Sequence, residues 1–337
     1  MALTDKLSAI GDAIRAKTGG TDMLTLDQMP TAIAGIQTDG TWNDTILKTL
    51  IQNENATVTN WPSGLSTIGA WAFYKSNLNF SSLPDGIIGI NAYAFYNCPN
   101  LTLTSLPSSL IAINGYAFFN CQNLALTSLP DSITGIDQYA FCDCPNIALT
   151  SLPAEITSIN DHSFANCTSL ALESLPSNLT DIGPSGFESC TSITLTSLPT
   201  GVTVIGSQAF YNCPNIELTS LPAGLTTLGS MAFHSCTNNK ITTVPNSIYE
   251  ISEGCFCSNG MTSFIIPINV QRVESNALSY CTSLASVTFK SVPTYIAENA
   301  FSGDTNLANI YVPWGEGIVA NAPWGATNAT IHYNTTT

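Results

Sequence analysis

One feature dominates this sequence: a unit of 23 residues that repeats over most of the chain. "LTSLPSSLIAINGYAFFNC" at 103–121 returns as "LTSLPDSITGIDQYAFCDC" at 126–144. The proline of the unit recurs at Pro84, Pro107, Pro130, Pro153, Pro176, Pro199, Pro222 and Pro245. About eleven units follow one another, and each is too short to bury a core of its own. Stacked copies can bury one continuous core, so the period predicts a solenoid with coils about 4.8 Å apart.

Three short apolar edges are predicted within one unit. The stretch "LTLTSL" at 101–106 alternates like a half-buried strand, and Pro107 ends it. Leu110 and Ile113 form a second edge. A third edge centres on the phenylalanine that follows the proline by 11 residues, which is Phe118 in this unit. We expect these rings to fill the centre of the coils.

Eight of the 11 cysteines occupy one place in the unit, three residues after the phenylalanine position. They are Cys98, Cys121, Cys144, Cys167, Cys190, Cys213, Cys236 and Cys281. Stacking in register places their Cβ atoms about 5 Å apart, farther than a disulfide prefers. A single-file row also does not converge on a metal, because zinc needs four converging ligands. Disulfides and metal remain alternatives, but we predict a ladder of free, buried thiols and no metal site.

Composition narrows the possible functions. The net charge is −15, so phosphate backbones would be repelled and nucleic-acid binding is not expected. No apolar run reaches the roughly 20 residues that span a bilayer. The N-terminal segment lacks the uninterrupted apolar region of a signal peptide, so we expect synthesis in a cytoplasm without export by that route. Free thiols agree with such a reducing compartment.

Catalytic motifs are not apparent. The three histidines have no triad partner or second metal ligand at useful spacing, and no phosphate-binding or metalloprotease motif occurs. The sequence predicts no enzyme, no catalytic residue and no cofactor. A carboxylate pair across neighbouring coils, as in glycosidases, stays open at this point.

The two ends depart from the repeat. Leu3, Leu7, Ile10 and Ile14 form one apolar helical seam in a predicted helical module at 1–40. The seam either packs on a second short helix of the module or pairs with other chains, and we predict that it serves assembly. The remaining divisions are an N-terminal cap at 41–60, the solenoid at 61–312 and a C-terminal cap at 313–337 closed by Trp314 and Trp324.

Aromatic residues recur in the two slots that flank the core phenylalanine. One slot holds Tyr93, Tyr116, Tyr139 and then His162, and the other holds Tyr96, Phe119, Tyr211 and His234. Stacking predicts rows along one edge, and such aromatics suit sugar faces and protein hot spots. The candidate ligand-binding residues are Tyr93, Tyr96, Tyr116, Phe119, Tyr139 and Tyr211. The alternative is that the tyrosines only cover the turn. A threonine row through Thr104, Thr127 and Thr150 is a second candidate surface.

The unit resembles the BspA-like leucine-rich repeats, whose copies read roughly "IPxxVTxIGxxAFxxCxxLTSI". The stretches "VTVIGSQAFYNCPNIELTSLP" at 202–222 and "LTTLGSMAFHSCTN" at 225–238 carry the likeness. It covers about three quarters of the chain. The resemblance implies a β-rich, right-handed curved solenoid with a row of strands on one face. It implies a scaffold for adhesion and display, without an enzymatic activity.

Both ends are similar to those of other proteins. "LSAIGDAIRAKTGGTDMLTLDQMPTAIAGI" and "IYVPWGEGIVANAPWGATNATIHYN" resemble tail and structural proteins of phages and prophages of Gram-positive gut bacteria. This implies a virion protein that attaches through residues 1–40 to other virion proteins or to copies of itself. Its solenoid would then bind a host glycan or surface protein. A bacterial cell-surface adhesin and a purely architectural virion part are the alternatives.

Overall fold

A computed structural model describes residues 65–77, 79 and 82–335 of this protein. The chain divides into two compact units, residues 1–146 and 147–337, and each is described by itself. The predicted helical module at 1–40, with Leu3, Leu7, Ile10 and Ile14, lies outside the described residues, as does the cap at 41–60. The boundaries predicted for these segments and for the C-terminal cap stay predictions.

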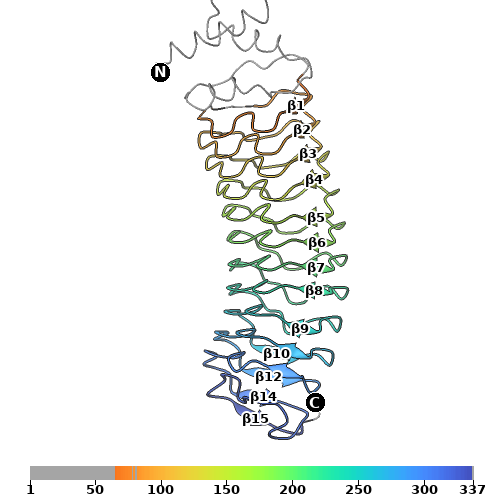
Figure 1. The fold of residues 1–337 in the computed structure, drawn as a ribbon, viewed down its shortest axis with the longest axis vertical. Coiled ribbons are helices and arrows are strands. Elements are labelled where there is room, and N and C mark those ends of the chain that lie inside the picture. Colours follow the sequence, from red (N-terminus) through yellow and green to blue (C-terminus); the bar gives the residue numbers. More distant parts are fainter. Residues whose placement is uncertain (1–64, 78, 80–81, 336–337) are drawn as a thin grey trace, which may run out of the picture. The chain divides into compact units, whose positions relative to one another are not determined.

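In the first unit, four strands of two residues lie one above another in a parallel sheet (Figure 1). They are β1 (Thr67–Ile68), β2 (Gly89–Ile90), β3 (Ala112–Ile113) and β4 (Gly135–Ile136). The register pairs equivalent residues of successive coils, for example Ile90 with Ile113. The second residue of each strand is buried, so this short ladder fixes one wall of the core.

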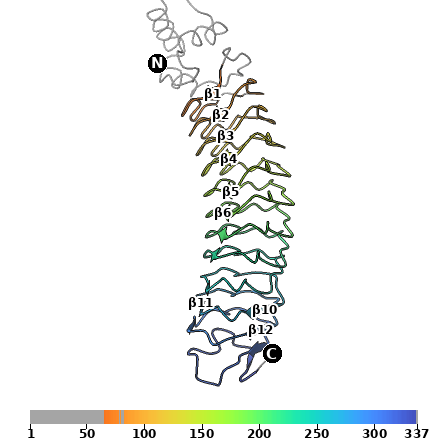
Figure 2. The ribbon, with the colours of Figure 1, turned by 90° about the vertical axis from the view of Figure 1, so that its right-hand side faces the viewer.

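In the second unit, strands at the equivalent place of the repeat form two parallel sheets. One contains β5 (Ser158–Ile159), β6 (Asp181–Ile182), β7 (Val204–Ile205) and β8 (Thr227–Leu228), and the other contains β9 (Glu250–Ile251), β11 (Arg272–Val273) and β13 (Tyr295–Ile296). A further sheet consists of β10 (Ser263–Ile266), β12 (Ser286–Phe289), β14 (Asn309–Tyr311) and β15 (Thr330–His332). Figure 2 shows β11 on the opposite side of the coils from β10 and β12. The predicted β-solenoid of about eleven turns is confirmed.

The strand predicted at 101–106 does not form, which corrects the expectation for this wall. The segment buries Leu101, Leu103 and Leu106, so Thr104 and Ser105 both face solvent in succession. A strand requires strict alternation of its side chains, and two successive outward residues break it. The coils remain in contact there through single bonds such as Ala125 N to Leu103 O, 3.1 Å.

The last coils do form a strand at the place where the sequence predicted one. In β12, Val287 and Phe289 are buried and alternate strictly with the residues between them. The ladder with β10 then runs over four residue pairs. The residues of β12 between Ser286 and Phe289 alternate singly between intermediate and buried positions, so this segment forms a regular sheet with β10.

The predicted central column of phenylalanines is present and fully buried in both units. In the first unit, Phe73, Phe95, Phe118 and Phe141 stack at centroid distances of 5.1, 5.2 and 5.4 Å. In the second unit, rings 164, 187, 210, 233 and 256 stack at 5.4–5.8 Å. The apolar core is thus a chain of nearest-neighbour ring contacts along each unit.

All 11 cysteines are free and buried, so the prediction of a ladder of free thiols is confirmed. Sequence reasoning missed what these thiols bond. Seven ladder thiols donate to the carbonyl oxygen of the phenylalanine in the preceding coil, as Cys121 Sγ does to Phe95 O at 3.0 Å. Asn259 occupies the same slot in its coil and donates through Nδ2 to Phe233 O at 2.6 Å. The slot therefore selects a small buried donor as well as a small hydrophobe.

The two tryptophans of the C-terminal segment are both buried. Trp314 and Trp324 meet edge to face at 6.4 Å, and Phe289 lies 5.2 Å from Trp314. The strand β15 adds to the edge of the sheet by pairing with β14. The apolar interior of the last coils is therefore covered by aromatic side chains.

Candidate functional site: an aromatic edge of the first unit

Two rows of aromatic rings run along one edge of the first unit. In the outer row, Trp71, Tyr93, Tyr116 and Tyr139 stack at 4.0, 4.7 and 4.5 Å with planes within 6° of parallel. In the second row, Tyr74, Tyr96 and Phe119 stack at 5.0 and 4.8 Å. Tilted contacts at 4.9–6.5 Å join the rows. The aromatic edge, as we call these seven residues, is one continuous surface.

Five of the six predicted binding residues belong to this edge, namely Tyr93, Tyr96, Tyr116, Phe119 and Tyr139. The sixth, Tyr211, lies in the second unit, where its ring stacks on His234 at 4.9 Å. Sequence reasoning missed Trp71 and Tyr74. They occupy the same two slots one coil earlier, so extending the slot pattern by one unit would have found them.

Stacking decides which atoms the edge presents. Rings within the outer row have a neighbour on each face, so a ligand meets their rims and phenolic hydroxyls. Trp71, at the start of the row, has 41% of its surface exposed, whereas Tyr93, Tyr116 and Tyr139 are half-buried. The edge is thus a row of hydroxyl groups on an apolar base.

The Tyr116 hydroxyl, in the middle of the outer row, is uncharged at neutral pH. Burial, followed by the neighbouring phenols of Tyr139 and Tyr93, raises the pKa of Tyr116 above its ordinary value. A neutral phenol both donates and accepts hydrogen bonds. The row therefore suits a ligand that carries hydroxyl or amide groups at regular intervals.

Backbone conformation makes this choice of residue unusual. Tyr93, Tyr116 and Tyr139 have φ angles of 60°, 59° and 57°, in the left-handed region. This conformation costs a non-glycine residue about 1–2 kcal/mol. The coils from Trp71 to Asn276 bend in this way at the same slot, and Gly254 fills that slot of its coil with φ 58°. Aromatic residues here are not explained by the turn alone, and ring stacking offsets part of their cost.

The threonine row, the second candidate surface, is exposed as expected. Thr104 and Thr127 in the first unit are exposed, and so is Thr150 in the second. The segment that carries Thr104 is not a strand, so this wall is not the regular β-surface that the sequence predicted. It carries no aromatic or charged group at these positions.

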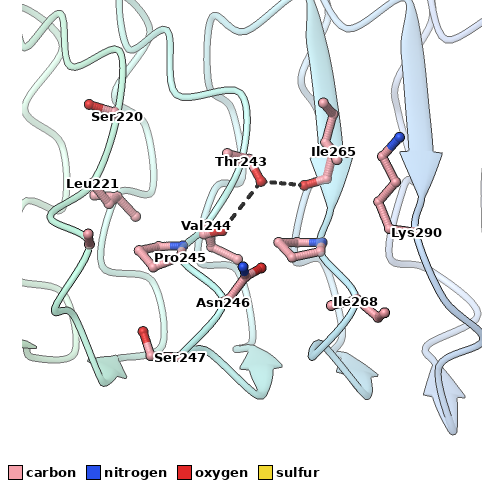
Figure 3. Close-up of a pocket in the computed structure, with 12 residues that line it drawn as sticks. Ser220, Leu221, Thr243, Val244, Pro245, Asn246, Ser247, Ile265, Ile268 and Lys290 are labelled. Atoms are coloured by element: carbon pink, nitrogen blue, oxygen red, sulfur yellow. Dashed lines mark hydrogen bonds between the residues drawn. The ribbon is translucent and has the colours of Figure 1, made fainter. Parts of the chain in front are cut away.

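The second unit contains a groove of about 620 Å³ on its proline-bearing wall (Figure 3). Its apolar lining includes Leu221, Val244, Pro245, Pro267 and Ile268. It opens at the coil where the irregular wall gives way to β10, a step marked by the lone bridge between Thr243 and Ile265. Thr243 Oγ donates across this step to Ile265 O at 2.9 Å.

Chemistry at the groove is limited by its side chains. Lys290 is the one titratable residue among those that line it. General acid–base catalysis requires a positioned pair of proton donor and acceptor, and this lining does not supply one. Within the part of the chain that the structure describes, no group of three or more His, Cys, Asp or Glu side chains could hold a metal ion.

Comparison with known proteins identifies the repeat. A family model described as the BspA type leucine rich repeat region matches residues 44–171, 88–217, 172–284 and 203–320. Among curated proteins, none matches the chain significantly. Over residues 65–335, apart from 78, 80 and 81, no helix is long and apolar enough to cross a membrane.

Several solved structures are similar to this chain. A leucine-rich repeat protein from Bacteroides ovatus has 20% identity and a TM-score of 0.55, with 82% of each chain covered. A leucine rich cell surface protein from Faecalibacterium prausnitzii has 24% identity and a TM-score of 0.48, covering 78% of this chain and 89% of that one. The pneumococcal vaccine antigen PcpA has 18% identity and a TM-score of 0.48, covering 84% and 80%. The Bacteroides ovatus structure shares the fold of this chain.

Proposed function

Because the chain belongs to the BspA-type leucine-rich repeat family, we propose that it is a non-enzymatic surface-display protein that binds a glycan or protein. The aromatic edge carries this proposal. Seven stacked aromatic side chains form one surface there, and the hydroxyl groups of the five tyrosines among them repeat along the coils. Surface aromatic groups with polar tips are typical of binding hot spots.

The family match favours the cell-surface adhesin alternative over a virion part. In the first interpretation the solenoid stands on a bacterial surface, and in the second it stands on a phage tail. Both use the same binding edge. Attachment of residues 1–40 to other virion proteins or to copies of the chain stays a prediction that rests on the amino-acid sequence of that segment.

An extended polymer fits this edge better than a compact ligand. The tyrosines of the outer row repeat their hydroxyls once per coil, with rings 4.5–4.7 Å apart. A polysaccharide or an extended peptide laid along the coils would meet several hydroxyls in succession. Such multivalent contact raises affinity without requiring a deep pocket.

Replacing the three tyrosines tests this function. We expect the variant Tyr93→Asn, Tyr116→Asn, Tyr139→Asn to bind its ligand at least tenfold more weakly, about 1.4 kcal/mol. Asparagine adopts positive φ readily, so the turns should persist. Binding to immobilised mucin glycans and Gram-positive wall polysaccharides would be measured by biolayer interferometry.

A matched control uses the same slot in the second unit. Gln208 and Met231 also have positive φ angles, of 58° and 57°, so changing both to Asn alters equivalent turns outside the edge. The control should bind normally. Unchanged binding by the folded triple variant would contradict the proposed site. No binding of the wild type to either glycan class would contradict these glycans as its ligand.

A further inference from the structure

One coil of the second unit carries apolar side chains where the coils before it are polar or small. The outward position two residues before the proline holds, in successive coils, Ser174, Ser197, Ser220, Thr243 and then Ile265. The position directly after the proline holds Ser177, Thr200, Ala223, Asn246 and then Ile268. Both isoleucines are exposed, by 40% and 59%. Single exposed apolar residues are ordinary, but two neighbouring positions that change together form a patch that favours an interaction.

The two isoleucines line the groove of about 620 Å³ on the proline-bearing wall (Figure 3). Leu221, Val244 and Pro267 continue its apolar lining, so the groove crosses successive coils. Sites for small ligands have volumes of about 300–1,000 Å³, with a mostly apolar lining and a few polar groups that fix orientation. The size and lining of this groove therefore suit a small apolar ligand.

A lysine stands at one end of the groove. Lys290 occupies the slot that holds Pro245 and Pro267 in the two preceding coils, and it is exposed. Figure 3 shows Lys290 at one end of the lining residues and Ser220 at the other. The net charge of the chain is −15, so an anionic ligand requires a local cation such as this one. The groove thus combines an apolar body with a positive end.

Two hydroxyl groups of the lining are already engaged in bonds between coils. Thr243 Oγ donates to Ile265 O at 2.9 Å, and Ser247 Oγ donates to Leu225 O. Their hydrogen atoms are therefore taken up by the protein itself. A bound peptide needs partners for each backbone N–H and C=O that it buries, whereas an aliphatic chain needs none. These contacts favour an aliphatic ligand over a peptide.

We propose that this groove binds a medium-chain aliphatic carboxylate. The hydrocarbon chain lies across the coils against Ile265, Pro267 and Ile268. The carboxylate accepts a hydrogen bond from Lys290 Nζ, which fixes the direction of the ligand in the groove. The site shares no residue with the aromatic edge, so it does not depend on the function proposed for that edge.

Decanoate and octanoate, kept below their micelle concentrations, are the test probes. A ligand-observed NMR titration of the full-length protein at pH 7.5 should show one saturable site per chain. Decanoate should bind more tightly than octanoate by about threefold or more, because two further CH₂ groups leave water. Octanamide has the shape of octanoate without its charge, and it should bind more weakly by about threefold or more.

Substitutions at the groove separate its positive end from its apolar body. Lys290→Met keeps the length of the side chain, and it should weaken octanoate by about threefold or more while octanamide binds as before. The control is Lys240→Met, which changes an exposed lysine that pairs with Glu217 outside the groove and should bind both ligands normally. The double variant Ile265→Thr, Ile268→Asn copies the preceding coil. It should keep the melting temperature and weaken both ligands about tenfold.

The proposal would be overturned by a lack of saturable decanoate binding, or by normal binding of the folded double variant. Equal losses of octanoate binding in Lys290→Met and Lys240→Met would also overturn it, because the cation at the groove would then have no special role. A blocked tetrapeptide of three valines and one glutamate is titrated in parallel. Saturable binding of this peptide without binding of decanoate would assign the groove to a protein partner instead.

Discussion

At the scale of single residues, one buried slot shows what the solenoid requires in each coil. The slot three residues after the core ring usually holds a cysteine whose thiol donates to a carbonyl of the preceding coil. Asn259 makes the same bond with an amide. Asp304 also falls in this slot, where its Oδ1 accepts from Cys281 N at 2.7 Å. Its buried Oδ2 can meet the requirement for a donor only when it is protonated.

Asp304 should therefore make stability depend on pH. Its pKa is about 8 in the folded protein, above the ordinary value of 3.8, so the folded state holds the proton more tightly. The stabilisation from this proton is complete below pH 3.8 and is lost as pH rises toward about 8. We expect the melting temperature of Asp304→Asn to exceed that of the wild type by an amount that grows over this range. Circular dichroism melts at pH 4, 6 and 8.5 measure it.

The control for this prediction is Asp131→Asn, an exposed aspartate of the first unit. Its melting temperature should follow the wild type at every pH. If the melting temperature of Asp304→Asn also followed that of the wild type at every pH, the Asp304 carboxyl would be ionised in the folded protein. The slot would then tolerate a side chain that only accepts hydrogen bonds.

At the scale of elements, the coil is held by a ring stack on the inside and by short ladders on the wall. Each strand of the first sheet has only two residues, so the ladders alone supply few hydrogen bonds. Buried phenylalanine rings contribute more, because each contacts the ring above and the ring below. Damage to one coil should therefore also destabilise the neighbouring coils, as in other repeat arrays.

Phe118→Ala tests the ring stack. Phe118 lies 5.2 Å from Phe95 and 5.4 Å from Phe141, so its removal leaves a cavity with two exposed ring faces. We expect a loss of about 3–5 kcal/mol in the free energy of unfolding. Urea denaturation gives this value. Phe119→Ala, next to it on the aromatic edge, is half-buried and should cost less. A smaller loss for Phe118 than for Phe119 would contradict a core role.

At the scale of the whole molecule, the solenoid presents a surface that is rich in Ser, Thr and Asn and poor in charge. Only 9% of residues are charged, and the net charge is −15. Side chains of this kind also join the coils, as Asn123 Nδ2 does by donating to Pro99 O at 2.6 Å. This surface does not favour binding to polyanions, which agrees with a glycan or protein ligand.

Removal of residues 1–40 tests the assembly module at this scale. Because Leu3, Leu7, Ile10 and Ile14 form an apolar seam, we expect deletion to abolish self-association while the solenoid keeps its melting temperature. Sedimentation equilibrium of the two proteins gives their masses. The quadruple change of these residues to Ser, in the full chain, should reproduce the deletion. Equal masses for all three proteins would show that the seam does not assemble the chain.

The sequence by itself determined the coil. A fixed period of 23 residues cannot drift out of register, so equivalent positions of neighbouring coils must stack. The column containing Phe118 and the ladder of free thiols containing Cys121 followed from this, as did the row containing Tyr116. Local spacing is sufficient for these features because each depends only on which residues share a slot.

The tertiary structure alone decided which segments pair and which atoms face outward. Residues 101–106 looked like a strand, yet Ala112–Ile113 forms the ladder, because pairing requires both coils to be extended at the same residues. The tyrosine rows were predicted, but only the structure shows that neighbouring rings cover one another's faces. The bond from a thiol to the preceding coil was likewise invisible in the sequence. These contacts depend on side-chain direction at the turns, which a residue pattern does not encode.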